Sequence, residues 1–313
     1  MRVIARAPTR LDLGGGWTDV PPICSNDYGA VTAIAIERHA TVTLEAIVGP
    51  SNDLTMEPLA RAALRRAGLH QVHATINSNF PFGAGLGGSS AAGVALQAAI
   101  AAWRGEFVDP MELVARARVV ETTDLKVTGG WQDYCAAAYG GPLAMRFGPD
   151  LPTVRPLVVA DTTMAAFERR AVLVYTGESR ISSRTITGVL SAWREGRGDV
   201  RANLLHMRDL AEQMELALVR GNLDELSDLM RAHWERQRAL REDITTDRID
   251  ALISQAAAVG ATGYKALGAS GGGCVLLLAP EDRVESVRRT AAGLGEVLPY
   301  TVARTGVQIT VAH

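Results

Sequence analysis

The chain has 313 residues, of which 47% are hydrophobic and 21% charged, and this balance excludes a disordered chain, a collagen-like fibre and a coiled coil. The formal net charge of -2 and the aromatic content of 5% argue against a nucleic-acid partner, which usually needs a basic surface and often a base-stacking platform. At roughly 150 residues per domain, the length favours two domains.

Cysteine usage and hydropathy indicate the compartment. Cys24, Cys135 and Cys274 are odd in number and form no CxxC pair, so neither a disulfide framework nor a structural zinc site is expected. The nearly apolar stretch 91–103 is too short to span a bilayer, and residues 1–6 lack the apolar core of a secretory signal. We therefore expect a cytoplasmic protein with no membrane partner, either a monomer or a homodimer.

The first half of the chain reads as strands followed by helices. Alternating and β-rich runs predict strands over 3–7, 10–13, 30–37, 40–47 and 72–77. Helical periodicity predicts helices over 58–67, 89–103 and 110–122. Arg38-His39 is interpreted as the turn between the third and fourth strands, and Asp109 as the cap of the third helix.

The second half has longer helices. Strands are predicted over 143–147, 171–175 and 275–278, and helices over 199–220, 224–240, 248–259 and 281–293. Gly221-Asn222 separates the two longest helices, and Asp224 is interpreted as the cap of the second. We divide the chain into domains 1–160 and 161–313.

The most informative segment is 81–92, in which four glycines lie within six residues directly ahead of an alanine-rich helical pattern. Glycine lets backbone amides approach an anion, and the start of a helix favours a phosphate. It is not a Walker A loop, because no Gly-Lys-Ser/Thr follows. A flexible turn with a serine cap is the alternative interpretation, and phosphate binding is the one that the added serines favour.

Charged residues elsewhere suit phosphoryl transfer. Glu121 closes a helix and Asp133 follows a glycine turn, and two carboxylates near a triphosphate can hold a metal and accept a proton. Arg10 precedes three glycines and Asp19 follows them; a guanidinium suits a phosphate, and a short carboxylate suits vicinal hydroxyls. Taken singly, Glu121 and Asp133 are more often a cap or a solvated side chain, and Arg10 and Asp19 a surface salt bridge and an Asx turn.

Two further segments have residues suited to binding a ligand. The run 268–273 contains four glycines ahead of a strand, which allows close approach of a ligand or of another loop. Arg180 and Arg184 lie among small hydroxyl residues and would suit a sugar phosphate. A strand-entry turn and a polar loop that opens a helix are the respective alternatives.

Together and in this order, these segments resemble the GHMP small-molecule kinases. Residues 81–92 resemble the glycine-rich ATP loop of that family and 268–273 its C-terminal glycine motif. Residues 6–10 and 12–19 are similar to the start of the heptose 7-phosphate kinases and of the fucokinase kinase domain, and 129–134 and 176–180 fit the same branch. The resemblance extends from Arg6 to about Leu278.

The resemblance implies an α+β fold of two domains, the first of the ribosomal protein S5 domain 2-like type and the second ferredoxin-like, with the site between them. It implies Asp133 as the catalytic aspartate with Arg10 beside it, and Ser90 and Glu121 as Mg²⁺ ligands. The implied ATP-binding residues are Gly83, Gly85, Leu86, Gly87, Gly88, Ser89 and Ser90. The implied substrate-binding residues are Asp19, Gly15, Gly16, Thr18, Gly130, Arg180, Arg184, Gly271 and Gly272.

The implied activity is transfer of phosphate from ATP, with Mg²⁺, to the anomeric hydroxyl of a small sugar. The motif branch and the two arginines favour D-glycero-D-manno-heptose 7-phosphate as the acceptor, giving the 1,7-bisphosphate. L-Fucose or another sugar is the alternative, and a mevalonate-type kinase fits less well. A non-catalytic sensor of sugar and ATP is the alternative of another class, which the joint presence of Asp133, Glu121 and Arg10 disfavours.

Overall fold

The computed structural model describes residues 1–47, 56–179 and 182–312, with side chains omitted for 182–184. Its strands are β1 (Arg2–Gly14), β2 (Gly29–Ala46), β3 (Val72–Ser78), β4 (Pro142–Phe147), β5 (Thr153–Pro156), β6 (Ala171–Tyr175), β7 (Gly263–Ala266), β8 (Cys274–Leu278), β9 (Glu296–Val297) and β10 (Gln308–Ala312). Its helices are α1 (Ile23–Asp27), α2 (Pro58–Arg66), α3 (Gly88–Trp103), α4 (Pro110–Val119), the π-helical turn η2 (Val120–Asp124), α5 (Gln132–Tyr139), α6 (Asp161–Arg170), α7 (Ser182–Arg194), α8 (Gly198–Arg220), α9 (Leu223–Arg238), the short turn η3 (Glu242–Ile244), α10 (Asp247–Ala258) and α11 (Val284–Ala292).

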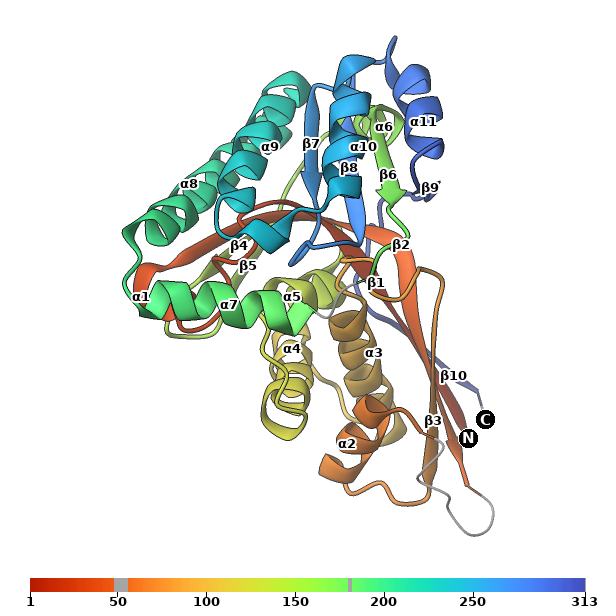
Figure 1. The fold of residues 1–313 in the computed structure, drawn as a ribbon. Coiled ribbons are helices and arrows are strands. Elements are labelled where there is room, and N and C mark those ends of the chain that lie inside the picture. Colours follow the sequence, from red (N-terminus) through yellow and green to blue (C-terminus); the bar gives the residue numbers. More distant parts are fainter. Residues whose placement is uncertain (48–55, 180–181, 313) are drawn as a thin grey trace.

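These elements form two layered halves, which confirms the predicted α+β class (Figure 1). The strands of the first sheet follow the order β10-β1-β2-β4-β5, and β3 also pairs with β2. Helices α3 and α5 pack against β1 and β2. The second sheet has the order β7-β8-β6-β9 and packs against α9, α10 and α11.

Helix α3 is the central helix of the first half. Every residue from Ser90 to Ala101 is buried, as expected for a helix that is apolar on all sides. Its many alanines let it lie close to β1 and β2 on one side and to α4 and α5 on the other. This packing holds the start of the helix, where the predicted phosphate loop ends, in a rigid position.

The predicted turn at Arg38-His39 is wrong. Strand β2 runs unbroken through these residues, and β1 likewise runs through Pro8. The two strands pair along nearly their whole length, with an irregularity at which Pro8 faces His39 and Thr9 faces Ile36. The register passes over Glu37 and Arg38, which therefore form a bulge, while His39 stays paired with Pro8.

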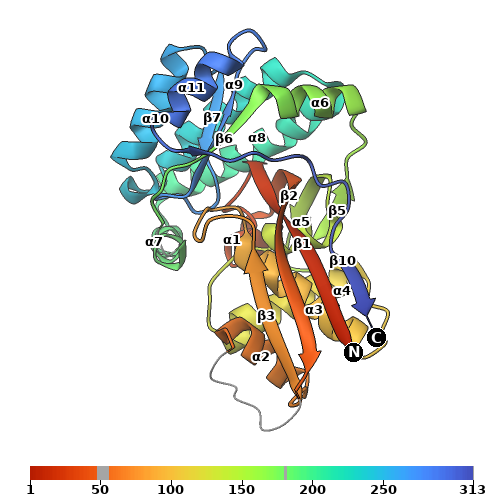
Figure 2. The ribbon, with the colours of Figure 1, turned by 90° about the vertical axis from the view of Figure 1, so that its right-hand side faces the viewer.

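The end of the chain returns to the first sheet. Strand β10 pairs antiparallel with β1, so the two termini lie side by side, as Figure 2 shows. A shared apolar core also joins the halves, since Leu11 and Ile34 of the first sheet pack in one cluster with Leu276 of the second. The division at residue 160 stays a prediction; what the structure adds is that the last strand completes the sheet of the first half.

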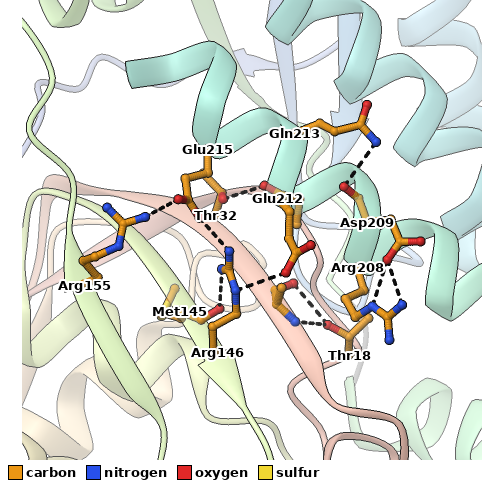
Figure 3. A network of polar contacts seen from close by, with 12 residues as sticks. Thr18, Thr32, Met145, Arg146, Arg155, Arg208, Asp209, Glu212, Gln213 and Glu215 are labelled. Carbon is orange, nitrogen blue, oxygen red and sulfur yellow. Dashed lines mark hydrogen bonds and ion pairs between the residues drawn. The ribbon is translucent and has the colours of Figure 1, made fainter. Parts of the chain in front are cut away.

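Polar contacts attach α8 to the first sheet (Figure 3). Arg146 of β4 and Arg155 of β5 both pair with Glu215 of α8, the first at 2.8 Å. Thr32 of β2 donates its hydroxyl to the carbonyl of Ala211 at 2.8 Å. The Glu215 side chain is only 9% exposed, so the charge is held between two guanidinium groups rather than by water.

Several elements between the predicted ones carried too weak a pattern for the sequence to indicate them. The loop expected between β4 and β6 contains β5 and α6, and β7, β9 and β10 are also additional. Of these strands, β9 and β10 pair with strands distant in the sequence, whereas β5 and β7 pair with the neighbouring strands β4 and β8. Among the described residues, no helix has the length and apolar character needed to cross a membrane.

The predicted cap of α9 is also wrong. Gly221 ends α8 in the left-handed conformation, and Asn222, not Asp224, caps α9 by accepting a hydrogen bond from the Glu225 amide at 3.1 Å. The cap is the residue directly before the first helical residue. The first helical residue of α9 is Leu223, so the cap is Asn222. Asp224 instead lies inside the first turn and pairs with Arg170.

We expect Asn222→Ala to lower the free energy of unfolding by about 1 kcal/mol, because an amide at the helix start loses its acceptor. The matched control is Asp224→Ala, whose carboxylate is 82% exposed and should contribute about 0.5 kcal/mol or less. Urea denaturation measures both. A larger loss for Asp224→Ala than for Asn222→Ala would contradict the assignment of the cap.

Candidate active site

The loop before α3, residues 81–87, has the form of an anion-binding site, and we name it the phosphate loop. Gly83, Gly85 and Gly87 all have positive φ, at 68°, 73° and 79°, a conformation that glycine adopts without strain. Gly87 occupies the cap position of α3, and no side chain caps the helix. The alternative of a serine cap is therefore excluded. The open amides at the start of a buried helix are what a phosphate requires.

The C-terminal glycine run packs directly against this phosphate loop, as the sequence allowed. The Cys274 amide donates to the Ala84 carbonyl at 2.8 Å. A Cβ at Gly85 would lie 2.7 Å from the Leu267 carbonyl oxygen. Both Gly271 and Gly272 are buried among backbone groups of the protein. Their predicted contact with substrate stays a prediction, whereas their contact with loops is direct.

Asp133 and Arg10 meet beside the phosphate loop. The Arg10 side chain places Nε and Nη2 at 2.8 and 2.7 Å from Oδ1 of Asp133. It also donates from Nη1 to the Gly85 carbonyl at 2.6 Å, and its own amide donates to the Leu86 carbonyl at 3.1 Å. A Cβ on Gly87 would lie 2.9 Å from Cγ of Asp133. The aspartate is therefore held against the phosphate loop by one arginine.

The side chains of Asp133 and Arg10 differ in their exposure to solvent. The Asp133 side chain is 27% exposed and that of Arg10 is 3% exposed. Both arginine nitrogens engage Oδ1, and within the described part of the chain no donor is bonded to Oδ2. One carboxylate oxygen is thus fixed by the protein and the other is open to a hydroxyl group of an acceptor.

Glu121 lies beside the start of α3, where it contacts Ser89. Its position comes from η2, where α4 widens into a π-helical turn, a distortion frequent at functional sites. The Ser89 hydroxyl donates to Oε1 of Glu121, and Oε2 is buried with no hydrogen-bond partner. Burial raises the pKa of Glu121, and the hydrogen bond from Ser89 opposes that rise.

These groups fit a divalent cation shared with a nucleotide. The unpartnered Oε2 and the adjacent serine hydroxyls are the oxygen donors that Mg²⁺ prefers, in a set small enough to leave room for phosphate oxygens and water. Across residues 1–47, 56–179 and 182–312, no three His, Cys, Asp or Glu side chains gather into a metal site made by protein alone. Ser89 makes the direct contact with Glu121, and Ser90 is the buried serine next to it.

Asp19 holds the segment that leads to Asp133. Its Oδ2 accepts from the amides of Trp131 and Gln132 at 2.8 and 2.9 Å, at the start of α5. A Cβ on Gly130 would lie 1.9 Å from that oxygen, so only glycine fits there. Asp19 is 1% exposed, and burial, with added repulsion from the carboxylates of Asp133 and Asp12, raises its pKa to about 6. Its contact with sugar hydroxyls stays a prediction.

The rest of residues 12–19, which we name the acceptor loop, is buried in packing contacts. The Gly15 amide donates to Nε2 of His233 at 2.8 Å, and the Thr18 hydroxyl donates to the Gly15 carbonyl at 2.6 Å. A Cβ on Gly16 would lie 2.4 Å from Oδ2 of Asp12. Contacts of Gly15, Gly16 and Thr18 with a substrate stay a prediction; in the structure these residues also shape the loop.

The predicted sugar-phosphate arginines are not placed by the structure. Arg180 lies outside the described residues, and so does the side chain of Arg184, whose backbone begins α7. The segment before them does contact the glycine run, because the Thr176 hydroxyl donates to the Gly273 carbonyl at 2.8 Å. Their role in binding a phosphate stays a prediction.

Two charged residues near the site were missed. The Lys265 ammonium is fully buried against Asp12, and the Arg118 guanidinium stacks 4.1 Å from the ring centroid of Trp131. Lys265 had a signal, since the chain contains only two lysines and this one lies three residues before the predicted glycine segment 268–273. Arg118 had none, because its partner is brought close by the packing of α4 against α5.

Comparison with known protein families agrees with this geometry. Residues 54–141 match the family described as GHMP kinases N terminal domain, and residues 214–296 match GHMP kinases C terminal. The two matches lie in the expected order, and together they cover more than half of the chain.

Individual relatives are more distant. The bifunctional fucokinase/GDP-fucose pyrophosphorylase of Arabidopsis thaliana is 24% identical over 90% of this chain, and the L-fucokinase/L-fucose-1-P guanylyltransferase of Bacteroides fragilis is 27% identical over 89%. This chain spans only 30% and 35% of those two proteins. The D-glycero-alpha-D-manno-heptose 7-phosphate kinase of Campylobacter jejuni is 25% identical, with 97% of each chain covered.

Solved structures share the fold. A D-glycero-D-manno-heptose 1-phosphate kinase from Bacteroides thetaiotaomicron superposes with a TM-score of 0.79 over 99% of both chains at 24% identity. The galactokinase of Lactococcus lactis, solved with galactose, gives a TM-score of 0.76 at 17% identity, covering 99% of this chain and 95% of the galactokinase. At these identities the likeness establishes the two-domain architecture alone.

Proposed function

The chain belongs to the GHMP kinases, and we propose that it is an ATP-dependent sugar kinase that phosphorylates the anomeric C1 hydroxyl of its acceptor. The observation that carries this proposal is the position of Asp133. It lies against Gly87 of the phosphate loop, one oxygen is engaged by Arg10, and the other is open. A donor phosphate and an acceptor hydroxyl would meet at that oxygen.

In the proposed reaction, the acceptor oxygen forms a bond to the γ-phosphorus of ATP while the bond to the ADP oxygen breaks. The proton of the hydroxyl goes to Oδ2 of Asp133, and ADP carries the displaced electron pair. Arg10 faces the charge that gathers on the transferring group and keeps Asp133 oriented. Positioning and electrostatics supply most of the rate in such transfers.

Glu121 and Ser90, with Ser89 beside them, would hold Mg²⁺. The ion supplies neutralisation of phosphate charge when bound. The unpartnered Oε2 of Glu121 supports this role, because a buried carboxylate oxygen with no donor is costly unless a ligand meets it.

We expect Glu121→Gln to raise the Mg²⁺ concentration for half-maximal rate by on the order of tenfold or more, since loss of a ligand costs at least as much as loss of an outer partner. The control is Glu112→Gln on the same helix, whose side chain is 49% exposed. Titration of the rate with Mg²⁺ at saturating ATP measures both. An unchanged Mg²⁺ requirement in Glu121→Gln would remove it from the metal site.

For the acceptor we propose D-glycero-D-manno-heptose 7-phosphate, converted to the 1,7-bisphosphate. Support comes from the Campylobacter jejuni heptose 7-phosphate kinase, which this chain matches over nearly its whole length. L-Fucose phosphorylated at C1 is the second candidate, because two relatives of similar identity are fucokinases. The three free cysteines are all buried, which suits the reducing cytoplasm that we propose for this reaction.

A kinase assay with a panel of acceptors tests the proposal. The panel contains the heptose 7-phosphate, L-fucose, D-galactose and mevalonate, with ADP release as the readout and phosphorus NMR to locate the new phosphate. We expect turnover on the heptose 7-phosphate with a new signal at C1. Efficient use of free fucose would replace the heptose assignment, and no ADP release with any sugar would overturn the sugar-kinase proposal.

A further inference from the structure

A buried lysine of the second half of the chain reaches the acceptor loop. Lys265 lies in β7, and its Nζ donates to the Asp12 carbonyl at 2.9 Å and pairs with Oδ2 of Asp12 at 3.1 Å. The side chains are 0% and 1% exposed. Two opposite charges are thus removed from water at the junction of the two sheets, 253 residues apart in the sequence.

A second buried side chain supports the same loop. His233 of α9 is 0% exposed, and its Nε2 accepts the Gly15 amide at 2.8 Å. The acceptor loop therefore receives direct polar contacts from the second half at two of its residues, Asp12 and Gly15. Neither His233 nor Lys265 takes part in the proposed transfer.

The segment that carries Lys265 also contacts the phosphate loop. Strand β7 continues into the glycine run, and at the end of that run the Cys274 amide donates to the Ala84 carbonyl at 2.8 Å. Gln237 fixes the run between these ends, since its Nε2 donates to the Ser270 hydroxyl at 2.7 Å. Residues 265–274 thus hold the acceptor loop at one end and the phosphate loop at the other.

Stability alone does not account for a charged pair in this place. Removing two charges from water costs more than their attraction commonly returns, and a well-packed apolar pair of similar size is often as stable. Oδ1 of Asp12 is also buried with no partner, which adds to the cost. Asp12 lies two residues from Arg10 on the same face of β1, so its position determines how that strand presents Arg10 to Asp133.

We propose that Lys265, assisted by His233, is a positioning residue that sets the spacing between the acceptor loop and the phosphate loop. The expected effect on acceptor turnover rests on the proposed function. The expected effect on the order of the acceptor loop rests on the contacts alone. The positioning role of Lys265 gives the C-terminal glycine segment a task on the acceptor side of the reaction, in addition to its contact with the phosphate loop.

Amide hydrogen exchange tests the structural part without any turnover. In Lys265→Met we expect exchange in peptides covering 12–19 to rise by about tenfold or more, and exchange over 88–92 to stay within about twofold. His233→Leu should raise exchange of the Gly15 amide in the same way. The matched control is Lys126→Met, which changes the other lysine of the chain, an exposed one. Unchanged exchange over 12–19 would overturn the proposal.

Steady-state kinetics test whether Lys265 affects turnover of the acceptor. With the heptose 7-phosphate as the probe, Lys265→Met should lower kcat/KM for the acceptor by on the order of 10 to 10². The Kd of a non-hydrolysable ATP analogue, measured by calorimetry, should change by less than about threefold, because the start of α3 is untouched. Equal loss of analogue binding and acceptor turnover would show general damage and contradict a positioning role.

The double variant Asp12→Asn with Lys265→Met decides the case if the single variant does not fold. It leaves no unpaired buried charge, so we expect a wild-type melting temperature with acceptor kcat/KM still reduced. Wild-type kcat/KM in this variant would overturn the proposal. If the wild type phosphorylates no sugar, the proposed function fails, and the exchange measurements still decide the role of Lys265.

Discussion

Asp133→Asn and Asp133→Ala are expected to lower kcat by about 10² to 10⁴, the usual contribution of a positioned acid–base group. In both variants the acceptor hydroxyl loses the open carboxylate oxygen beside the phosphate loop. The asparagine variant is the more informative, because its amide oxygen can still accept from Arg10, whose side chain is 3% exposed. The alanine variant leaves that buried guanidinium with the Gly85 carbonyl but without its carboxylate partner, and it should also be less stable.

Rapid-quench measurement of ADP formation, with melting temperatures recorded in parallel, checks this prediction. Asp150→Ala is the matched control, since Asp150 is an exposed aspartate in the connection between β4 and β5. We expect wild-type turnover from the control and a wild-type melting temperature from Asp133→Asn. Near-normal turnover in a folded Asp133→Asn variant would remove the residue from the reaction.

Asp19→Asn is expected to abolish a pH dependence of stability. Burial raises the pKa of Asp19 from the usual 3.8 to about 6, so the folded protein binds this proton more tightly than the unfolded chain does. The wild type should therefore lose stability as the pH rises from about 4 to about 6, and level off above that. The total loss from this one group is about 3 kcal/mol.

The variant keeps its hydrogen bonds, because an amide oxygen can accept from the Trp131 and Gln132 amides in place of Oδ2. Oε1 of Gln132 has no partner in the structure, so that side chain can turn to accept the new amide group. The difference in unfolding free energy between wild type and variant, measured by urea denaturation from pH 4.5 to 7.5, isolates the contribution of Asp19. Parallel curves would contradict the raised pKa.

The acceptor kcat/KM should depend on pH in the direction opposite to stability. If the Asp19 carboxylate grips acceptor hydroxyls, kcat/KM for the sugar in the wild type falls as the pH drops through about 6, where stability rises. At neutral pH the asparagine variant should lose about tenfold or more in acceptor kcat/KM, the worth of a hydrogen bond to a charged group. A variant that is as active as the wild type across this range would leave Asp19 with a purely structural role.

Local pattern was sufficient for the phosphate loop and for most helices. The spacing of Gly83, Gly85 and Gly87 ahead of an alanine-rich run predicted both the loop conformation and α3, because positive φ and helical periodicity are properties of neighbouring residues. The pairing of Asp133 with Arg10 was expected from a family resemblance, and the structure places them in contact.

Features that depend on partners distant in the sequence were beyond that reach. The continuity of β2 through Arg38-His39 follows from its pairing with β1. A run of residues read alone contains no information about which other strand will supply its hydrogen bonds.

The sequence by itself determined the family, and it predicted the phosphate-binding loop and the reacting carboxylate, because each of these features lies in a contiguous motif. Only the tertiary structure decided that Asp19 is buried beneath the Trp131 and Gln132 amides, and that Lys265 supports the acceptor loop from the second half of the chain. The physical reason is that burial, and with it the pKa of a carboxyl and the partner of a buried charge, is a property of the packed molecule. The contacts of Asp19 with Trp131 and of Lys265 with Asp12 join residues more than 100 positions apart, and they form only in the folded chain.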